Sequence, residues 1–301
     1  MKVFIVAERS RMLEYLLKMM PEYKRNKVKS FLIYKSVSVN GVTRTKHDHF
    51  LARGDKVTIR TSEKEARQAE RRYSIRIVYE DKDIFVIDKP AGLLTIATEK
   101  IKTKTAYYEL TDYAKLADPS GKGRVFIVHR LDRDTSGLLV FARNEDGKRK
   151  LQGNWEKAEK KYLAVVDGVP SKASDIIRSY LIESKFHKVY SGPKTAESKL
   201  AVTRYKILRS NGKHSLLEVI LETGRKNQIR VHMSDIGHPV SGDEKYGSST
   251  DLSGRIALHA SHLAFDHPAT GKRMVFESPI PDSMSSIFRC ISSKPFVRKK
   301  G

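Results

Sequence analysis

The sequence predicts an α+β fold in which a large domain with a mainly antiparallel or mixed β-sheet and flanking helices follows a small α/β domain. Three observations predict it. From residue 75 onward, strand-like apolar segments come in pairs around polar turns. Helical candidates at residues 105–116, 145–156 and 227–236 interrupt these pairs. The first 60 residues instead hold two short amphipathic segments followed by a hairpin signal.

The small domain is expected over residues 1–60. Its first helix is predicted at residues 11–20, where apolar side chains recur at one-face spacing before Pro21. A second helix is expected over residues 24–35, and Asn40-Gly41 after an alternating Val/Ser strand is typical of a tight hairpin. The outward face of the second helix is basic and carries Lys24, Arg25, Lys27 and Lys29.

The domain boundary is predicted at residues 61–73, which are polar and charged and show no core-forming periodicity. The large domain is then expected over residues 74–290, and residues 291–301 form a basic tail. The strand pairs of this domain are IRIVYE with IFVIDKP, VFIVHRL with GLLVFAR, RYKIL with LLEVIL, and LAFDHP with RMVFESP.

The charge balance indicates a polyanionic partner. The chain has 58 Lys and Arg against 35 Asp and Glu, a net charge of +23, of which +10 lies in residues 1–72. A generally basic protein without a dedicated site is the alternative. Cys290 is the single cysteine, so an internal disulfide is excluded, and no apolar run approaches the ~20 residues of a membrane span. We expect a cytoplasmic protein that is a monomer and has no membrane contact.

The segment most informative about chemistry is VFIVHRLDRDTSGLLVFAR, residues 125–143. A polar turn lies between two apolar strands, which is a suitable place to hold a catalytic group rigidly. The turn contains Arg130, Asp132, Arg133 and Asp134. Taken alone, such a turn favours a structural network of ion pairs over a catalytic site.

The order of several motifs distinguishes these alternatives. His129-Arg130-Leu131-Asp132 with Thr135-Ser136-Gly137, preceded by Asp88-Lys89-Pro90-Ala91-Gly92-Leu93, resembles the RluA family of pseudouridine synthases. The resemblance continues through the tyrosine segment 160–168, the arginine segment 223–232, and Gly237-His238-Pro239 with Gly242-Asp243. Residues 9–60 separately resemble the alpha-L RNA-binding domain. Together they imply an isomerase that converts uridine in RNA to pseudouridine without a cofactor or metal.

The resemblance also implies roles for individual residues. Asp132 is the essential carboxylate, Tyr162 its aromatic neighbour and Arg230 its ion-pair partner; a nearby guanidinium would favour the charged form of a carboxylate in a closed pocket. Arg130, Arg225 and Gln228 are assigned to RNA, with Arg130 aiding base flipping. From the residues alone, Tyr162 remains open to being an ordinary strand tyrosine and Arg230 to being a phosphate contact. Most relatives carry His where this chain has Asn227.

The expected substrate is structured RNA, large-subunit ribosomal RNA in preference to transfer RNA. The alternatives are a non-catalytic RNA-binding or ribosome-assembly protein, and a glycosidic hydrolase, which would call for a second catalytic carboxylate. The histidines of the chain lack the spacing and cysteine partners of a metal site. These histidines are His47, His49, His259, His262 and His267.

Overall fold

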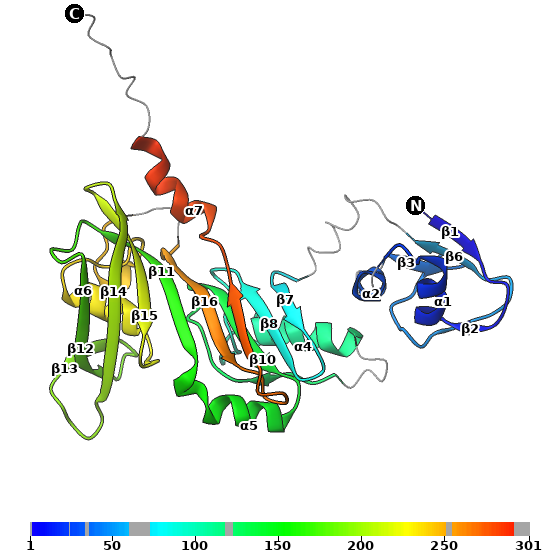
Figure 1. Cartoon of the computed structure of the whole chain (residues 1–301), viewed down its shortest axis with the longest axis horizontal. Coiled ribbons are helices and arrows are strands. Elements are labelled where there is room, and N and C mark those ends of the chain that lie inside the picture. The colour runs from blue at the N-terminus through cyan, green and yellow to red at the C-terminus, as the bar shows by residue number, and fades with distance from the viewer. Residues whose placement is uncertain are drawn as a thin grey trace, which may run out of the picture. The chain divides into compact units, whose positions relative to one another are not determined.

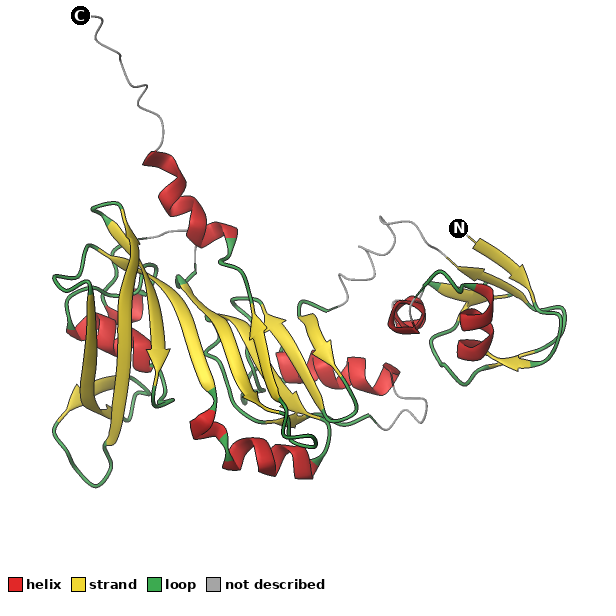
Figure 2. Ribbon diagram, viewed as in Figure 1, coloured by secondary structure: helices red, strands yellow, loops and turns green. Residues whose placement is uncertain are grey.

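The computed structural model describes residues 2–23, 25–33, 36–59, 73–117, 123–250 and 255–291. The chain divides into two compact units, residues 1–76 with 96–126, and residues 77–95 with 127–301. Figures 1 and 2 show their elements. The predicted linker lies outside the described residues except for Tyr73, and so does the tail except for Ile291. The predicted domain boundaries therefore remain predictions.

The first unit packs short helices on a small antiparallel sheet. Both predicted helices and the hairpin lie where the sequence places them, and Asn40 and Gly41 take the positive φ values, 49° and 84°, that such a turn requires. Apolar side chains of both helices and of the sheet form its core. The sheet order is β1-β6-β3-β4, with a separate β2-β5 pair. The elements are β1 (Lys2–Ile5), β2 (Ser10–Arg11), α1 (Met12–Met19), α2 (Arg25–Ile33), β3 (Val37–Val39), β4 (Val42–Thr43), β5 (Phe50–Leu51), β6 (Lys56–Ile59) and α4 (Ala106–Ala117).

The second unit is built on a long mixed sheet, to which β7 (Arg76–Glu80) also belongs. Its order is β13-β12-β14-β15-β11-β16-β10-β8-β7, with β17 beside β16 and β9 beside β10. β10 and β16 run parallel, whereas β8–β10, β11–β16 and β11–β15 are antiparallel. The strands are β8 (Ile84–Lys89), β9 (Phe126–Ile127), β10 (Ser136–Ala142), β11 (Glu159–Asp167), β12 (Ser174–Glu183), β13 (Val189–Gly192), β14 (Lys199–Ser210), β15 (His214–Leu221), β16 (Leu258–Asp266) and β17 (Arg273–Glu277).

Helices and short helical turns of the second unit connect these strands and lie beside the sheet (Figure 2). Among the described residues, no helix combines the length and apolarity needed to cross a lipid bilayer. Near the site, α6 packs on β13 and β14, and its apolar residues join those of β11, β14 and β15 in one core. The helices are α5 (Glu145–Gly153), η1 (Trp155–Lys157), α6 (Gln228–Asp235), η2 (Glu244–Tyr246), α7 (Asp282–Ser285) and η3 (Ser286–Ile291).

The predicted α+β class with a mainly antiparallel or mixed sheet is confirmed. Two local differences matter for the site. The strand expected over residues 125–131 is reduced to β9, because the backbone of Leu131 leaves the sheet and bonds to the side chain of Thr95. The hairpin of β12 and β13 is not among the predicted strand pairs, since residues 174–183 lack a strict alternation of apolar and polar side chains.

Candidate active site

The turn that carries Asp132 is fastened to the segment that follows β8. The Thr95 hydroxyl donates to the Leu131 carbonyl at 2.7 Å and accepts from the Leu131 N–H at 3.2 Å. The N–H of Gly92 donates to the carbonyl of Arg133 at 2.9 Å. Bonds on both sides of Asp132 thus fix its backbone, and the carboxylate is presented from a rigid support.

Below this turn lies a buried ammonium group, that of Lys89. Burial lowers the pKa of Lys89 to about 8, although Asp134 and Asp132 act in the opposite direction. The ammonium donates to the carbonyl oxygens of Pro90 at 2.9 Å, Leu93 at 2.7 Å and Arg133 at 3.0 Å. Three backbone acceptors match its three donors, so Lys89 joins the two segments of the turn.

β10 begins at Ser136, directly after the turn, and its second residue is Gly137. Its φ of 113° suits glycine, and an added Cβ would lie 2.2 Å from the carbonyl oxygen of Ala260. Gly137 pairs with Ala260 on β16, which in turn pairs with Tyr162 on β11. The absence of a side chain at Gly137 therefore allows β10 to approach β16, the strand that lies between β10 and the strand that carries Tyr162.

Tyr162 lies at a register shift of β11, between Lys161 and Tyr162, where the pairing with β16 is irregular. Such bulges re-aim side chains next to functional sites. The ring is half-buried and lines the same pocket as Asp132. Burial, and then the charge of Asp132, raise the pKa of the Tyr162 phenol well above its ordinary value. The hydroxyl is therefore neutral at physiological pH.

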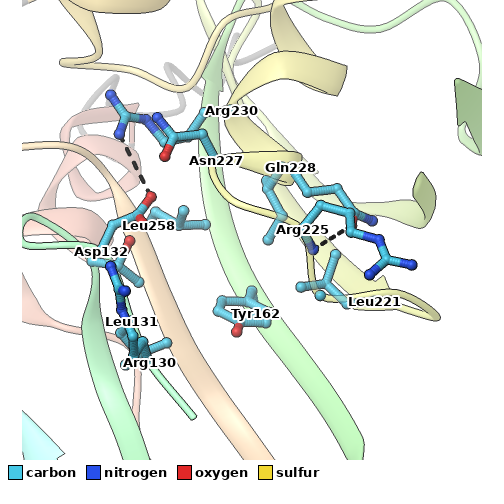
Figure 3. A pocket seen from close by; sticks show the side chains of 13 residues that line it. Arg130, Leu131, Asp132, Tyr162, Leu221, Arg225, Asn227, Gln228, Arg230 and Leu258 are labelled. Atoms are coloured by element: carbon cyan, nitrogen blue, oxygen red, sulfur yellow. Dashed lines mark hydrogen bonds and ion pairs between the residues drawn. The ribbon is translucent and has the colours of Figure 1, made fainter. Parts of the chain in front are cut away.

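Arg230 projects from α6 and faces two carboxylates. Its Nη1 lies 3.6 Å from Oδ2 of Asp132, as Figure 3 shows. Its Nε and Nη2 donate to Asp243 at 2.5 and 2.8 Å, in a bidentate pair buried from solvent. Burial works to lower the pKa of Arg230, but the hydrogen bonds and charge of Asp243, with Asp132 and Tyr246, outweigh it and raise this pKa. Arg230 is thus held by Asp243 while a free edge reaches Asp132.

Tyr246 completes the support of this guanidinium. The Arg230 guanidinium carbon lies 4.9 Å from the centre of the buried Tyr246 ring, a cation–π distance. The Tyr246 hydroxyl accepts from Nδ2 of Asn227 at 3.1 Å and from the backbone N–H of Val189 at 3.2 Å. The sequence motifs contain Asp243 but assign it no role, and they do not contain Tyr246. A buried partner for Arg230 is the requirement that could have indicated both.

Asn227 precedes α6 in the left-handed conformation, with φ of 55°. Asparagine is enriched in this region several-fold because its short polar side chain tolerates it. Its carbonyl also accepts the N–H of Val231 at 3.0 Å and so begins the helix. The departure from histidine at this position is therefore compatible with the local backbone.

Gln228 is buried, and its amide group is used within the protein. Its Oε1 accepts from the Thr223 hydroxyl at 2.7 Å and the Arg225 N–H at 3.0 Å. Its Nε2 donates to the Val202 carbonyl at 3.0 Å and the Thr203 hydroxyl at 2.9 Å. These contacts make Gln228 the residue that shapes the loop before α6. Its expected contact with RNA remains a prediction.

One open pocket is lined by Asp132, Tyr162, Asn227, Gln228 and Arg230 (Figure 3), and its empty space of about 460 Å³ includes open solvent. The turn supplies one wall and α6 with its preceding loop the other, with Tyr162 of β11 between them. The structure thus brings together Asp132, Tyr162 and Arg230, as the sequence analysis expects. The lining residues also include the expected Arg130, Arg225 and Gln228, of which Arg130 and Arg225 are solvent-exposed.

His129, the first residue of the His129–Asp132 motif, does not line the pocket. Its Nε2 accepts the backbone N–H of Val140 at 3.2 Å, and its ring centre lies 4.3 Å from that of Trp155. Burial, with the charge of Lys160, lowers the pKa of His129 to about 3. The imidazole is neutral and serves to anchor β10.

The expected basic residues of α2 belong to the first unit. Arg25 is exposed and Lys29 half-buried. Lys24 lies outside the described residues, and the side chain of Lys27 is not described either.

A group of possible metal ligands, Asp81, Asp83 and His267, lies elsewhere in the second unit. Nε2 of His267 bonds to Asp81 at 2.9 Å. Its Nδ1 accepts the N–H groups of Ala269 and Thr270 at 3.3 and 3.2 Å. Both ring nitrogens are used, and the group ties the β16–β17 turn to the turn before β8.

Comparison with known proteins agrees with this geometry. A model of the family described as RNA pseudouridylate synthase matches residues 83–235. A Bacillus subtilis protein named uncharacterized RNA pseudouridine synthase YlyB is 36% identical over 272 residues, which cover 88% of this chain and 89% of the relative. The Zymomonas mobilis ribosomal large subunit pseudouridine synthase D is 36% identical over 234 residues, covering 72% and 73%. The human structure of RNA Pseudouridylate Synthase Domain Containing 4 aligns with a TM-score of 0.59 at 25% identity, covering 70% of this chain and 90% of that one.

The fold, the pocket and these relatives define a class of enzyme, the isomerases that convert uridine in RNA to pseudouridine. The chain belongs to the RNA pseudouridylate synthase family, as its resemblance to the RluA group predicts. It is an RNA pseudouridine synthase.

Proposed function

We propose that this enzyme isomerises a uridine of large-subunit ribosomal RNA and that Asp132 is its catalytic carboxylate. The observation that carries the proposal is the arrangement of one half-exposed carboxylate, that of Asp132, 3.6 Å from a guanidinium whose other side is bound by buried Asp243. Arg230 is therefore preorganised, and Asp132 stays accessible to a substrate.

The proposed chemistry begins with a uridine flipped into the pocket. Asp132 either attacks the anomeric carbon or removes the proton from the neighbouring sugar carbon to give a glycal. In both routes the glycosidic bond to nitrogen breaks, uracil leaves with the electron pair, and the ionised carboxylate is required. When the ring carbon bonds to the anomeric carbon, Asp132 is displaced or the sugar proton is returned, and the proton on that ring carbon is then lost. Tyr162 covers the uracil face and holds the detached base while it rotates and rejoins through a ring carbon. Exposed Arg130 occupies the place that the flipped nucleotide leaves, while Arg225 contacts the RNA.

The choice of ribosomal RNA is supported by relatives that are named ribosomal large subunit pseudouridine synthase D and by a net charge of +23. We assign the first 60 residues to an alpha-L RNA-binding domain, residues 61–73 to a linker and residues 74–290 to the catalytic domain. Contact of α2 with phosphates fits the exposed Arg25. The proposed enzyme is a cytoplasmic monomer.

Replacing Asp132 by Asn tests the catalytic assignment. This nearly isosteric change removes the charge, so we expect pseudouridine formation to fall by about 10⁴-fold or more, with RNA affinity within a few-fold of the unmodified protein. The matched control is Asp146→Asn on exposed α5, which should leave the rate unchanged. Normal product formation by Asp132→Asn would refute the assignment.

Pseudouridine mapping of ribosomal and transfer RNA from cells with and without the gene tests the substrate. The proposal expects a site in large-subunit ribosomal RNA to lose its modification. Loss confined to transfer RNA would replace the proposed substrate and leave the role of Asp132 intact.

A further inference from the structure

The tip of the β12–β13 hairpin presents a phenylalanine to solvent. Phe186 is 92% exposed, and the next most exposed large hydrophobic side chain among the described residues, Ile5, is 61% exposed. Covering an aromatic ring with a stacking partner is favourable, because it removes apolar area from water. Phe186 does not line the pocket of Asp132, so the site described above gives it no role.

The hairpin tip has a defined backbone conformation. The N–H of Ser184 donates to the carbonyl of Lys188 at 2.8 Å, and the N–H of His187 donates to the carbonyl of Ser184 at 2.9 Å. His187 adopts the left-handed conformation, with φ of 58°, and closes the turn next to Phe186. The ring therefore projects from a bonded turn, which lowers the entropy lost when a ligand covers it.

This hairpin is fastened to the residue that supports the active-site arginine. The backbone N–H of Val189 donates to the Tyr246 hydroxyl, and Lys245 donates to the carbonyl of His187 at 3.0 Å. The Tyr246 ring packs on Arg230, which reaches Asp132. Buried side chains at the base of the hairpin join those of α6 and η2 in one apolar cluster. The hairpin of Phe186 and the support of Arg230 are thus parts of one packed body, in which β12, β13 and α6 lie together (Figure 1).

The charges around Phe186 favour a polyanion. Lys185 and Lys188 flank the ring and are exposed. The one carboxylate in residues 180–190, that of Glu183, is paired with Lys226 and with His187. The ammonium of Lys188 lies 6.0 Å from the centre of the Tyr246 ring and still faces solvent, and Tyr190 of β13 is also exposed. An exposed aromatic ring beside exposed lysines matches single-stranded nucleic acid, whose bases stack while its phosphates bind lysines.

We propose that Phe186 is a base-stacking site for substrate RNA: its ring stacks on an unpaired base outside the catalytic pocket, and Lys185 and Lys188 contact the adjoining phosphates. This inference rests on the proposed RNA function and adds a second contact to it, distinct from the flipped uridine.

Two RNAs of equal length test it, a 20-nucleotide oligouridylate and a fully paired duplex, with the full-length protein. Phe186→Leu keeps an apolar side chain but removes the aromatic face. We expect about tenfold weaker binding of the oligouridylate, unchanged binding of the duplex, and an unchanged salt dependence, because both lysines still bind phosphates. Leu208→Ala, at an exposed position of β14, is the matched control and should change neither affinity.

Phe186→Trp reports stacking at this position directly, through the fluorescence of the new tryptophan. Because the chain has one other tryptophan, Trp155, the additional emission can be isolated by subtraction, and stacking should quench it on addition of the oligouridylate. Wild-type affinity of Phe186→Leu, or no quenching of Phe186→Trp, would overturn the proposal. Both readouts measure binding alone. An enzyme that binds oligouridylate through Phe186 but modifies no ribosomal RNA would refute the proposed substrate and leave the stacking site standing.

Discussion

The two units differ in whether they bury charged side chains. In the first unit, no described Lys, Arg, Asp or Glu is buried, and the core consists of apolar side chains of α1, α2 and the small sheet. The second unit buries Lys89, Arg230 and Asp243, each with hydrogen bonds that satisfy it.

The difference separates binding from chemistry. A buried charge is costly to desolvate and persists only with well-placed partners, whereas phosphates are bound by cations that stay in water. A protein that only bound RNA would need the first arrangement alone. The paired charges behind Asp132 therefore mark the part of the molecule where a reacting group has to be positioned.

The largest effect that this contrast predicts follows from Asp243→Asn. The substitution leaves the Arg230 guanidinium buried without its bidentate partner, which should lower the free energy of unfolding by about 3–5 kcal/mol. We also expect single-turnover pseudouridine formation to fall by more than about tenfold, since Arg230 is no longer oriented toward Asp132. Chemical denaturation and single-turnover assays measure the two effects. The first unit offers Asp55→Asn as a control. This half-buried carboxylate accepts from Asn40 and from the Ala52 N–H but pairs with no buried cation, so its loss should cost far less. Equal losses would remove the distinction.

Two asparagines in left-handed conformations give a second comparison, Asn227 before α6 and Asn40 in the β3–β4 hairpin. Asn227→Val introduces backbone strain and removes the bond to Tyr246, so we expect the free energy of unfolding to fall by about 2–3 kcal/mol and activity to fall with it. Asn227→Gly should restore most of the stability. Asn40→Val carries similar strain but should leave the catalytic rate of the folded protein unchanged. A rate loss of equal size in Asn40→Val would mean that activity reports general stability.

The sequence predicts much of this architecture because it is encoded locally. Turn chemistry at Asn40-Gly41 and Gly212 and the apolar runs of β8 and β10 indicate the hairpins directly, and the order of motifs indicates that Asp132, Tyr162 and Arg230 converge. The contacts of Arg230 depend instead on how α6 and the loop before η2 close in space. Position along the chain does not reveal that Asp243, rather than Asp132, is its bidentate partner.

The lowered pKa of Lys89 predicts that stability and reaction rate depend on pH through a group of the second unit. Its folded-state pKa of about 8 lies below its ordinary value of 10.5, so between these two pH values the unfolded chain binds the extra proton and this group's contribution to stability rises with pH. Loss of the proton relieves the fold of a buried charge, but the neutral amine can donate only two hydrogen bonds, so one of the three carbonyl contacts that hold the turn is lost. Single-turnover rates should therefore decline as pH rises through about 8, by up to about tenfold. Lys89→Met should be slower throughout and lack this decline, whereas Lys160→Met, at another buried lysine, should retain it. A decline that persists in Lys89→Met would assign it to another group.

The smallest effect is expected in the first unit, where the charges remain hydrated. Replacing Arg25 and Lys29 of α2 by Ala should weaken RNA binding a few-fold and reduce the slope of log affinity against log salt concentration by about 1–2, with the rate at saturating RNA unchanged. Filter binding between low and moderate salt measures the slope, and Arg149→Ala on exposed α5 is the control in the second unit. Because both substitutions remove only electrostatic attraction to phosphates, affinity should be recovered by lowering the salt concentration. An unchanged slope would mean that these cations contribute to solubility and do not bind phosphates. The RNA would then have to be bound by the second unit.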